Sequence, residues 1–214
     1  MPLALVVHAF GGHPLRYWYP WLARSLQDAF PSIEVKLLKM TNPQMPQIEV
    51  WLEDVRRGVC EYQRGSDEGF LYLIGHSVGC QTCVRFLASP DTPRLLQSVG
   101  LRIGGVVCAG AWFSVVDPWE SILPWCSAPI DSTTARLTLG GAPLVVFISD
   151  NDKYTPDYEG NAKIWEAEFG GVVKILPGRA HFSSKKQPEV LECVCSMVAR
   201  DTAYQRQGSA ERFE

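Results

Sequence analysis

Six short apolar runs rich in β-branched residues recur along the chain, and each is followed by a stretch of helical character. The runs lie at residues 3–10, 33–40, 69–76, 103–110, 143–150 and 171–178. Their hydrophobicity is nearly continuous rather than alternating, which is typical of strands covered on both faces in a parallel sheet. The pattern therefore predicts a single-domain α/β fold built on a doubly wound, mostly parallel sheet of about six strands with right-handed crossovers.

Helices are predicted between these strands, at 16–29, 46–64, 78–89, 157–169 and 187–201. The segment 111–142 is longer than a usual connection and holds three tryptophans, so it forms a small lid or a helical excursion over the strand ends, or else an irregular crossover. Residues 1–200 are expected to make up the domain. The polar tail 201–214 has little periodicity and is expected to be loosely ordered.

Composition narrows the class of protein. A chain of 214 residues with 46% hydrophobic and 20% charged residues can bury the core of one globular domain. Its net charge of -3, without a basic run, argues against a nucleic-acid partner. No apolar stretch reaches the ~20 residues of a membrane span. The seven cysteines, without an export signal, indicate reduced thiols and a cytoplasmic location.

The stretch "LIGHSVGCQ" places Ser77 in a G-x-S-x-G pattern. That pattern alone arises by chance in about one random chain of ten, so its position decides its meaning. Gly75 and His76 close the third apolar run, and a helical stretch begins at Val78. A serine held at such a sharp strand-to-helix turn is typical of a nucleophile elbow. The alternative is a structural serine that caps the helix.

A serine hydroxyl is a weak nucleophile at neutral pH and needs a base, which in turn needs an orienting acid. His181, in "GRAHF" after the last predicted strand, is the one histidine that follows Ser77 in the chain, and we expect it to be the base. His76 should face away from the neighbouring hydroxyl, because side chains alternate along a strand.

Two aspartates follow the fifth predicted strand, and either can be the acid. Asp152 is favoured because it lies on the loop beyond the strand end, within reach of an imidazole from the next loop. Asp150 lies closer to the strand and is the alternative, or else a turn or cap residue. Asp117 and Asp131 follow no strand end directly and are weaker candidates.

An oxyanion formed at this site needs two donors. We predict the backbone N–H groups of Val78, at the helix start, and of Phe10, in the glycine-rich loop "HAFGGHP" after the first strand. Aromatic residues near the predicted strand ends are expected to line an apolar pocket, with Trp18, Trp112 and Phe113 as the named candidates.

Several segments together carry a resemblance to a known family: "HAFGG", "WYPWLARSL", "MTNPQMPQIEVWL", "GHSVGC", "SDNDKYTP" and "GRAHF". The chain resembles the α/β-hydrolase superfamily, and within it the small serine hydrolases of the retinoblastoma-binding protein 9 type, the YdeN-like family, over residues 3–200. The resemblance implies a compact hydrolase without a large cap domain. It also implies a triad of Ser77, Asp152 and His181 that needs no metal or organic cofactor. The family's first loop usually reads His-Gly, where this chain has His8 and Ala9.

Other motifs point to no further chemistry. Cys80 and Cys83 form a C-x-x-C on the helix after the elbow and are interpreted as packing residues. Cys193 and Cys195 are too few for a zinc site, and no nucleotide-binding motif occurs. The sequence thus predicts a serine hydrolase of small carboxylic esters, with thioesters and amides left open. The rival hypothesis is a hydrolase-fold protein that serves mainly to bind a protein partner.

Overall fold

The computed structural model describes residues 1–62 and 68–210, which contain one six-stranded sheet. All of its strands run parallel, in the order β2-β1-β3-β4-β5-β6, which confirms the predicted architecture. The chain runs outward from β1 to β2 and then returns to β3, so the connections after β1 and β3 leave a switch point in strand order. The strands are β1 (Leu3–Val7), β2 (Glu34–Leu37), β3 (Gly69–His76), β4 (Leu101–Ala109), β5 (Leu144–Ser149) and β6 (Val172–Leu176).

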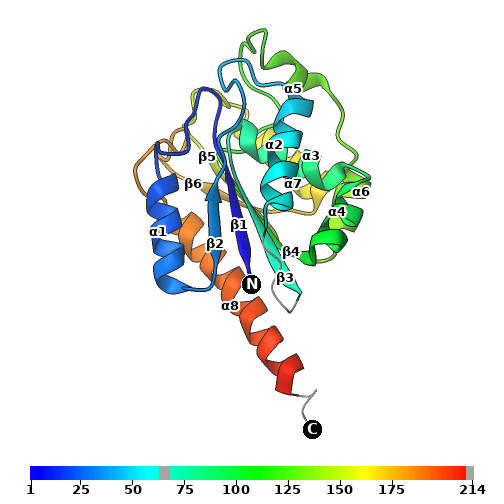
Figure 1. Ribbon diagram of the computed structural model, residues 1–214. Coiled ribbons are helices and arrows are strands. Elements are labelled where there is room, and N and C mark those ends of the chain that lie inside the picture. The colour runs from blue at the N-terminus through cyan, green and yellow to red at the C-terminus, as the bar shows by residue number, and fades with distance from the viewer. Residues whose placement is uncertain (63–67, 211–214) are drawn as a thin grey trace.

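Helices cover both faces of the sheet (Figure 1). One face carries α1 (Tyr19–Ala29) and α8 (Pro188–Ala210). The short α5 (Leu123–Ser127) lies beyond the carboxyl ends of the strands, at the top of Figure 1. The opposite face carries α2 (Ile48–Cys60), α3 (Val78–Ala88), α4 (Thr92–Val99), α6 (Ser132–Leu139) and α7 (Tyr158–Phe169).

The interior strand β1 shows why the apolar runs are continuous. Its side chains alternate between two hydrophobic clusters: Leu3, Leu5 and Val7 lie under α2 and α3, whereas Ala4 and Val6 lie under α1 and α8. All five are buried. A strand with helices on both sides has no face left for polar residues.

Three short helices are absent from the sequence prediction. Helix α4 lies inside the segment 89–102, and it ends at Gly100, whose φ of 70° gives a left-handed cap. Helices α5 and α6 lie within the long segment 111–142, so this segment is the helical excursion that was one of its expected forms and not an irregular crossover.

Two other helices differ from their predicted limits, which in part lie outside the described residues. Helix α8 extends to Ala210, past the predicted end at 201. A polar sequence with weak periodicity gives no clear sign of where a helix ends, so the predicted limit fell short. Residues 63–64 of the predicted helix 46–64, and residues 211–214 of the tail, lie outside the described residues.

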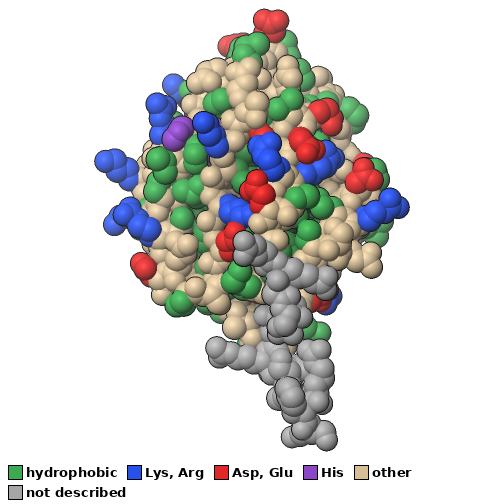
Figure 2. Space-filling model, in the orientation of Figure 1, with side chains coloured by type: hydrophobic (Ala, Val, Ile, Leu, Met, Phe, Trp, Pro, Cys, Tyr) green, Lys and Arg blue, Asp and Glu red, His purple; other side chains and the backbone are tan. Residues whose placement is uncertain are grey.

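Basic and acidic side chains both occur across the face seen in Figure 2. Within residues 1–62 and 68–210, no helix combines the length and the apolar character needed to cross a membrane. All seven cysteines are free thiols.

Candidate active site

Ser77 occupies the sharp turn between β3 and α3. Its backbone adopts φ 56° and ψ −123°, a region that side-chain-bearing residues rarely enter. Such a conformation costs about 1–3 kcal/mol and persists only where the surroundings hold it. Here the Ser77 N–H donates to the carbonyl of Ala109 on β4, at 2.9 Å. The predicted elbow is therefore present as a strained turn fixed to the neighbouring strand.

The two glycines of the motif allow α3 to approach the sheet closely. A Cβ at Gly75 would lie 2.6 Å from the backbone N and Cα of Cys80. A Cβ at Gly79 would lie 2.3 Å from the carbonyl oxygen of Val7 on β1. Both positions exclude any side chain, so the G-x-S-x-G spacing is required by packing.

The side chain of Ser77 does not cap its helix. Ser77 stands at the N-cap position of α3, but its hydroxyl makes no capping hydrogen bond. Its Oγ instead accepts from the indole Nε1 of Trp112, at 3.2 Å. Among the described residues, no hydrogen bond joins Ser77 Oγ to His181, although both line one cavity. Catalytic hydrogen bonds of this kind often tighten only around a substrate.

The structure brings Asp152 and His181 together. Asp152 Oδ2 lies 2.5 Å from His181 Nδ1, and its Oδ1 accepts from the Tyr154 N–H at 3.0 Å. The Asp152 carboxylate is almost fully buried, which fixes its orientation. Asp150 is exposed and accepts from the Gly178 N–H, as a turn residue does. Of the two aspartates after β5, only Asp152 reaches the imidazole.

The loop that carries His181 is held on both sides of the imidazole. Ala180 and Phe182, its neighbours in sequence, both have positive φ, at 47° and 52°. The Ala180 N–H donates to Asn151 Oδ1, and the carbonyl of Phe182 accepts from Trp18 Nε1 at 3.0 Å. Trp18 is therefore a fully buried anchor of this loop and not a lining residue of the pocket, which corrects the sequence prediction.

Two backbone donors lie beside Ser77. Val78 is the first residue of α3, so its N–H has no acceptor within the helix. Phe10 lies in the turn after β1 and lines the same cavity as Ser77. No described residue accepts from the Phe10 N–H, whereas the next amide, of Gly11, donates to the carbonyl of Pro43 at 2.7 Å.

A cavity of about 340 Å³ opens above Ser77, at the carboxyl ends of the strands. Trp112 lines it, as predicted, but Phe113 does not, because its ring stacks on Phe169 under α7 at 5.2 Å. The remaining lining residues are mostly aromatic or aliphatic, and none carries a carboxylate, ammonium or guanidinium group. The full lining is Ala9, Phe10, Tyr17, His76, Ser77, Trp112, Val115, Trp119, Ile122, Tyr154, His181 and Ser183.

Tyr17 and Tyr154 are lining residues that the sequence reasoning missed. Tyr154 follows Asp152 by two residues in a loop already assigned to the site, so proximity to the acid was an available signal. Tyr17 has no such signal, because its direction depends on a positive φ of 52° just before α1.

Arg85, on α3, holds the segment around α5 that bounds one side of this cavity. Its side chain is buried and donates to the carbonyls of Trp125, Ala128 and Pro129 at the end of α5. Burial lowers the pKa of the Arg85 guanidinium to about 10. Ile122, at the start of α5, lines the cavity. The bonds of Arg85 therefore join this side of the cavity to α3, the helix that follows Ser77.

Replacing Arg85 with methionine is expected to lower the free energy of unfolding by about 3 kcal/mol, because the carbonyls of Trp125, Ala128 and Pro129 lose the donor that a buried side chain supplies. Urea denaturation measures the change. Arg94→Met is the matched control: Arg94 is an exposed arginine of α4, and we expect a change within about 0.5 kcal/mol. Equal effects for the two variants would contradict the assigned role of Arg85.

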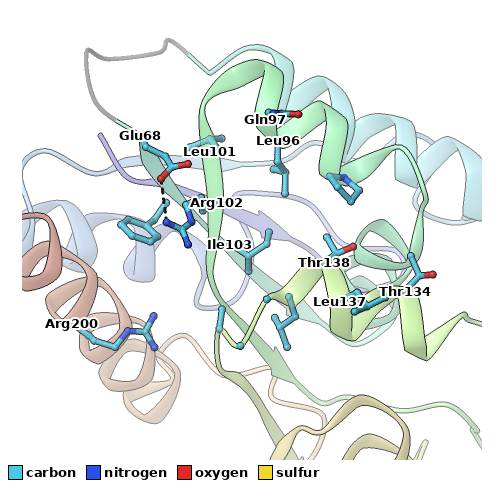
Figure 3. Close-up of a pocket in the computed structure, with 16 residues that line it drawn as sticks. Glu68, Leu96, Gln97, Leu101, Arg102, Ile103, Thr134, Leu137, Thr138 and Arg200 are labelled. Carbon is cyan, nitrogen blue, oxygen red and sulfur yellow. Dashed lines mark hydrogen bonds and ion pairs between the residues drawn. The ribbon is translucent and has the colours of Figure 1, made fainter. Parts of the chain in front are cut away.

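A larger cavity, of about 740 Å³, lies at the opposite end of the sheet (Figure 3). It is bounded by the start of β4 and by α4 and α6, with an ion pair between Arg102 and Glu68 at its rim. Among the described residues that line it, no nucleophile is paired with a base. Ligands of parallel α/β sheets bind at the carboxyl ends of the strands, where Ser77 lies, so the smaller cavity is the candidate site.

Metal-binding clusters are absent from the part of the chain that the structure describes: no three His, Cys, Asp or Glu side chains are grouped to hold an ion. Cys80 and Cys83 are fully buried, and Cys80 donates to the carbonyl of Ala109.

Comparison with known proteins identifies relatives of this chain. YdeN of Bacillus subtilis (strain 168), named as a hydrolase, is 32% identical over 99 residues, which cover 46% of this chain and 48% of YdeN. The match thus spans about half the length of that relative.

Solved structures share the fold. The crystal structure of the ydeN gene product from B. subtilis superposes with a TM-score of 0.74 at 19% identity, covering 93% of this chain and all of that one. Est1E from Butyrivibrio proteoclasticus, solved with ferulic acid bound, gives a TM-score of 0.61 at 14% identity and covers 95% of this chain and 90% of its own. The model of the family described as "Serine hydrolase" matches residues 4–200. This chain, which shares the fold of these hydrolase structures, therefore belongs to the serine hydrolase family.

Proposed function

We propose that the protein hydrolyses small carboxylic esters through a triad of Ser77, His181 and Asp152. The observation that carries the proposal is the 2.5 Å contact between Asp152 and His181, in the same cavity as a serine on a strained elbow. A carboxylate on Nδ1 leaves Nε2 unprotonated and free to accept the proton of Ser77.

The reaction proceeds in two halves. His181 Nε2 takes the Ser77 proton as Oγ attacks the ester carbonyl, and the oxyanion accepts hydrogen bonds from the N–H groups of Val78 and Phe10. The protonated imidazole then gives its proton to the leaving alkoxide, and an acyl-enzyme remains. A water molecule, deprotonated by His181, attacks the acyl carbon and releases the acid.

The cavity supports a small, uncharged substrate. Its volume of about 340 Å³ lies at the low end of the range for small-molecule sites. Because aromatic rings dominate the wall and no charged specificity residue faces inward, a short acyl or aryl ester fits better than a peptide. Thioesters and amides present the same carbonyl and can react by the same steps.

Labelling with a fluorophosphonate probe tests this proposal, because the probe forms a stable adduct only with an activated serine. We expect an adduct at Ser77, located by peptide mass spectrometry, and its loss in Ser77→Ala and His181→Ala. Ser184→Ala, which changes an exposed serine in the same loop as His181, is the control and should be labelled like the wild type. If folded wild-type protein takes up no probe, the hydrolase proposal is wrong and a partner-binding role replaces it.

A further inference from the structure

His76, the residue before the nucleophile, is fully buried, and both of its ring nitrogens have partners. Nε2 lies 2.8 Å from the carbonyl oxygen of His181, and Nδ1 lies 2.6 Å from the hydroxyl of Tyr19. A carbonyl can only accept, so Nε2 carries the proton. Nδ1 therefore accepts from the tyrosine. The ring thus has a single neutral tautomer.

Tyr19 extends this chain of bonds to the first loop. Its hydroxyl oxygen accepts from the N–H of Ala9, at 3.2 Å. Ala9 immediately precedes Phe10, the proposed oxyanion donor. Three hydrogen bonds therefore run from Ala9 through Tyr19 and His76 to the backbone of His181, and they pass beside Ser77.

His76 and Tyr19 stay neutral while His181 gains and loses a proton during the proposed reaction. Burial, together with the nearby His181, lowers the pKa of His76 to about 3. Burial likewise raises the pKa of the Tyr19 hydroxyl well above its usual value. The rings of His76 and His181 are 5.5 Å apart, so a second positive charge beside the imidazolium is strongly disfavoured. We therefore expect neither His76 nor Tyr19 to exchange protons during turnover.

Simple packing does not require these polar groups. An apolar side chain would fill the position of His76 without the need for two buried partners. The bonds instead join two loops that are far apart in sequence, one carrying the oxyanion donor and the other carrying the base. Misplacement of such groups by about 1 Å can reduce the rate about 100-fold.

We propose that Tyr19 and His76 are positioning residues, which hold the oxyanion loop and the His181 loop in fixed relation on either side of Ser77. This inference rests on the proposed hydrolase function. It adds a role for the residue before the nucleophile and explains why Ala9 takes a tyrosine partner.

The test compares Tyr19→Phe, His76→Leu and His76→Gln with wild type, using p-nitrophenyl acetate hydrolysis, the rate of fluorophosphonate labelling and the thermal midpoint. Tyr19→Phe and His76→Leu are expected to lower kcat and the labelling rate about 10- to 100-fold, with KM within about twofold. His76→Gln should recover part of the loss, because its amide N–H can still donate to the His181 carbonyl.

Tyr72→Phe is the matched control, since it removes a buried tyrosine hydroxyl bonded to Asp201 Oδ2 at 2.8 Å, away from the site. It should lower the thermal midpoint but leave kcat unchanged. If Tyr19→Phe lowers kcat no more than Tyr72→Phe, or if His76→Gln and His76→Leu are equally impaired, the positioning role is wrong while labelling of wild-type Ser77 still upholds the hydrolase function. Unlabelled, folded wild-type protein would overturn both.

Discussion

An Asp152→Asn variant is expected to lose about 10⁴-fold in kcat while it remains folded. Asparagine is nearly isosteric with aspartate, but its amide group can donate to Nδ1. The imidazole proton would then move to Nε2, which could no longer accept from Ser77. The buried position of Asp152 keeps the side chain in place, so the defect is one of proton location and not of packing.

The matched control is Asp150→Asn, two residues away on the same loop. Asp150 contacts a backbone N–H, and an asparagine oxygen can accept that bond equally well. We therefore expect kcat within about twofold of wild type for this variant. Steady-state ester hydrolysis measures both. If the two substitutions had similar effects, Asp152 would not be the residue that orients His181.

Gly79→Ala is expected to lower the free energy of unfolding by at least about 3 kcal/mol, and activity with it. The new methyl group would lie 2.3 Å from the carbonyl oxygen of Val7, and neither backbone segment can withdraw from the centre of the sheet. Because α3 must then move away from β1, Ser77 and the Val78 N–H move with it. The thermal midpoint should fall by about 6–12 °C.

Gly141→Ala separates this clash from the general effect of replacing a glycine. Gly141 has φ 82°, and an added Cβ there would meet nothing within 4 Å. Only the strain of a left-handed alanine remains, which is about 1–2 kcal/mol. Full activity and a smaller shift in thermal midpoint are expected. A Gly79→Ala variant as stable as Gly141→Ala would contradict the close approach of α3 to β1.

The strands were predictable because each one is a short, continuous run of hydrophobic residues. All six apolar runs became strands, since burial on both faces requires continuous hydrophobicity, and β1 shows this directly. Helices α4 to α6 have five to eight residues, too few for a periodic face to stand out from its surroundings. Their end signals were present, with a proline near the start of α4 and a glycine after α6, but such signals mark turns equally well.

For the site as well, some features follow from the sequence pattern and others do not. Ser77, Asp152 and His181 each follow a strand end, and the parallel topology brings those ends together. The direction of an aromatic side chain has no such rule. Trp18 turns toward the face covered by α1 and α8, and Phe113 turns toward α7, because backbone angles near each residue decide where its ring packs. The sequence contains these rings but not their orientation.

The site is assembled from the loops after β1, β3, β4, β5 and β6, and this has a consequence for the protein during its synthesis. The proposed nucleophile leaves the ribosome about a hundred residues before its base. Parallel strands pair only after long connections are complete, so the imidazole has no place beside Ser77 until β6 has joined the edge of the sheet. A growing chain therefore passes through synthesis without a complete site, and the proposed esterase activity would report that the last strand has been added.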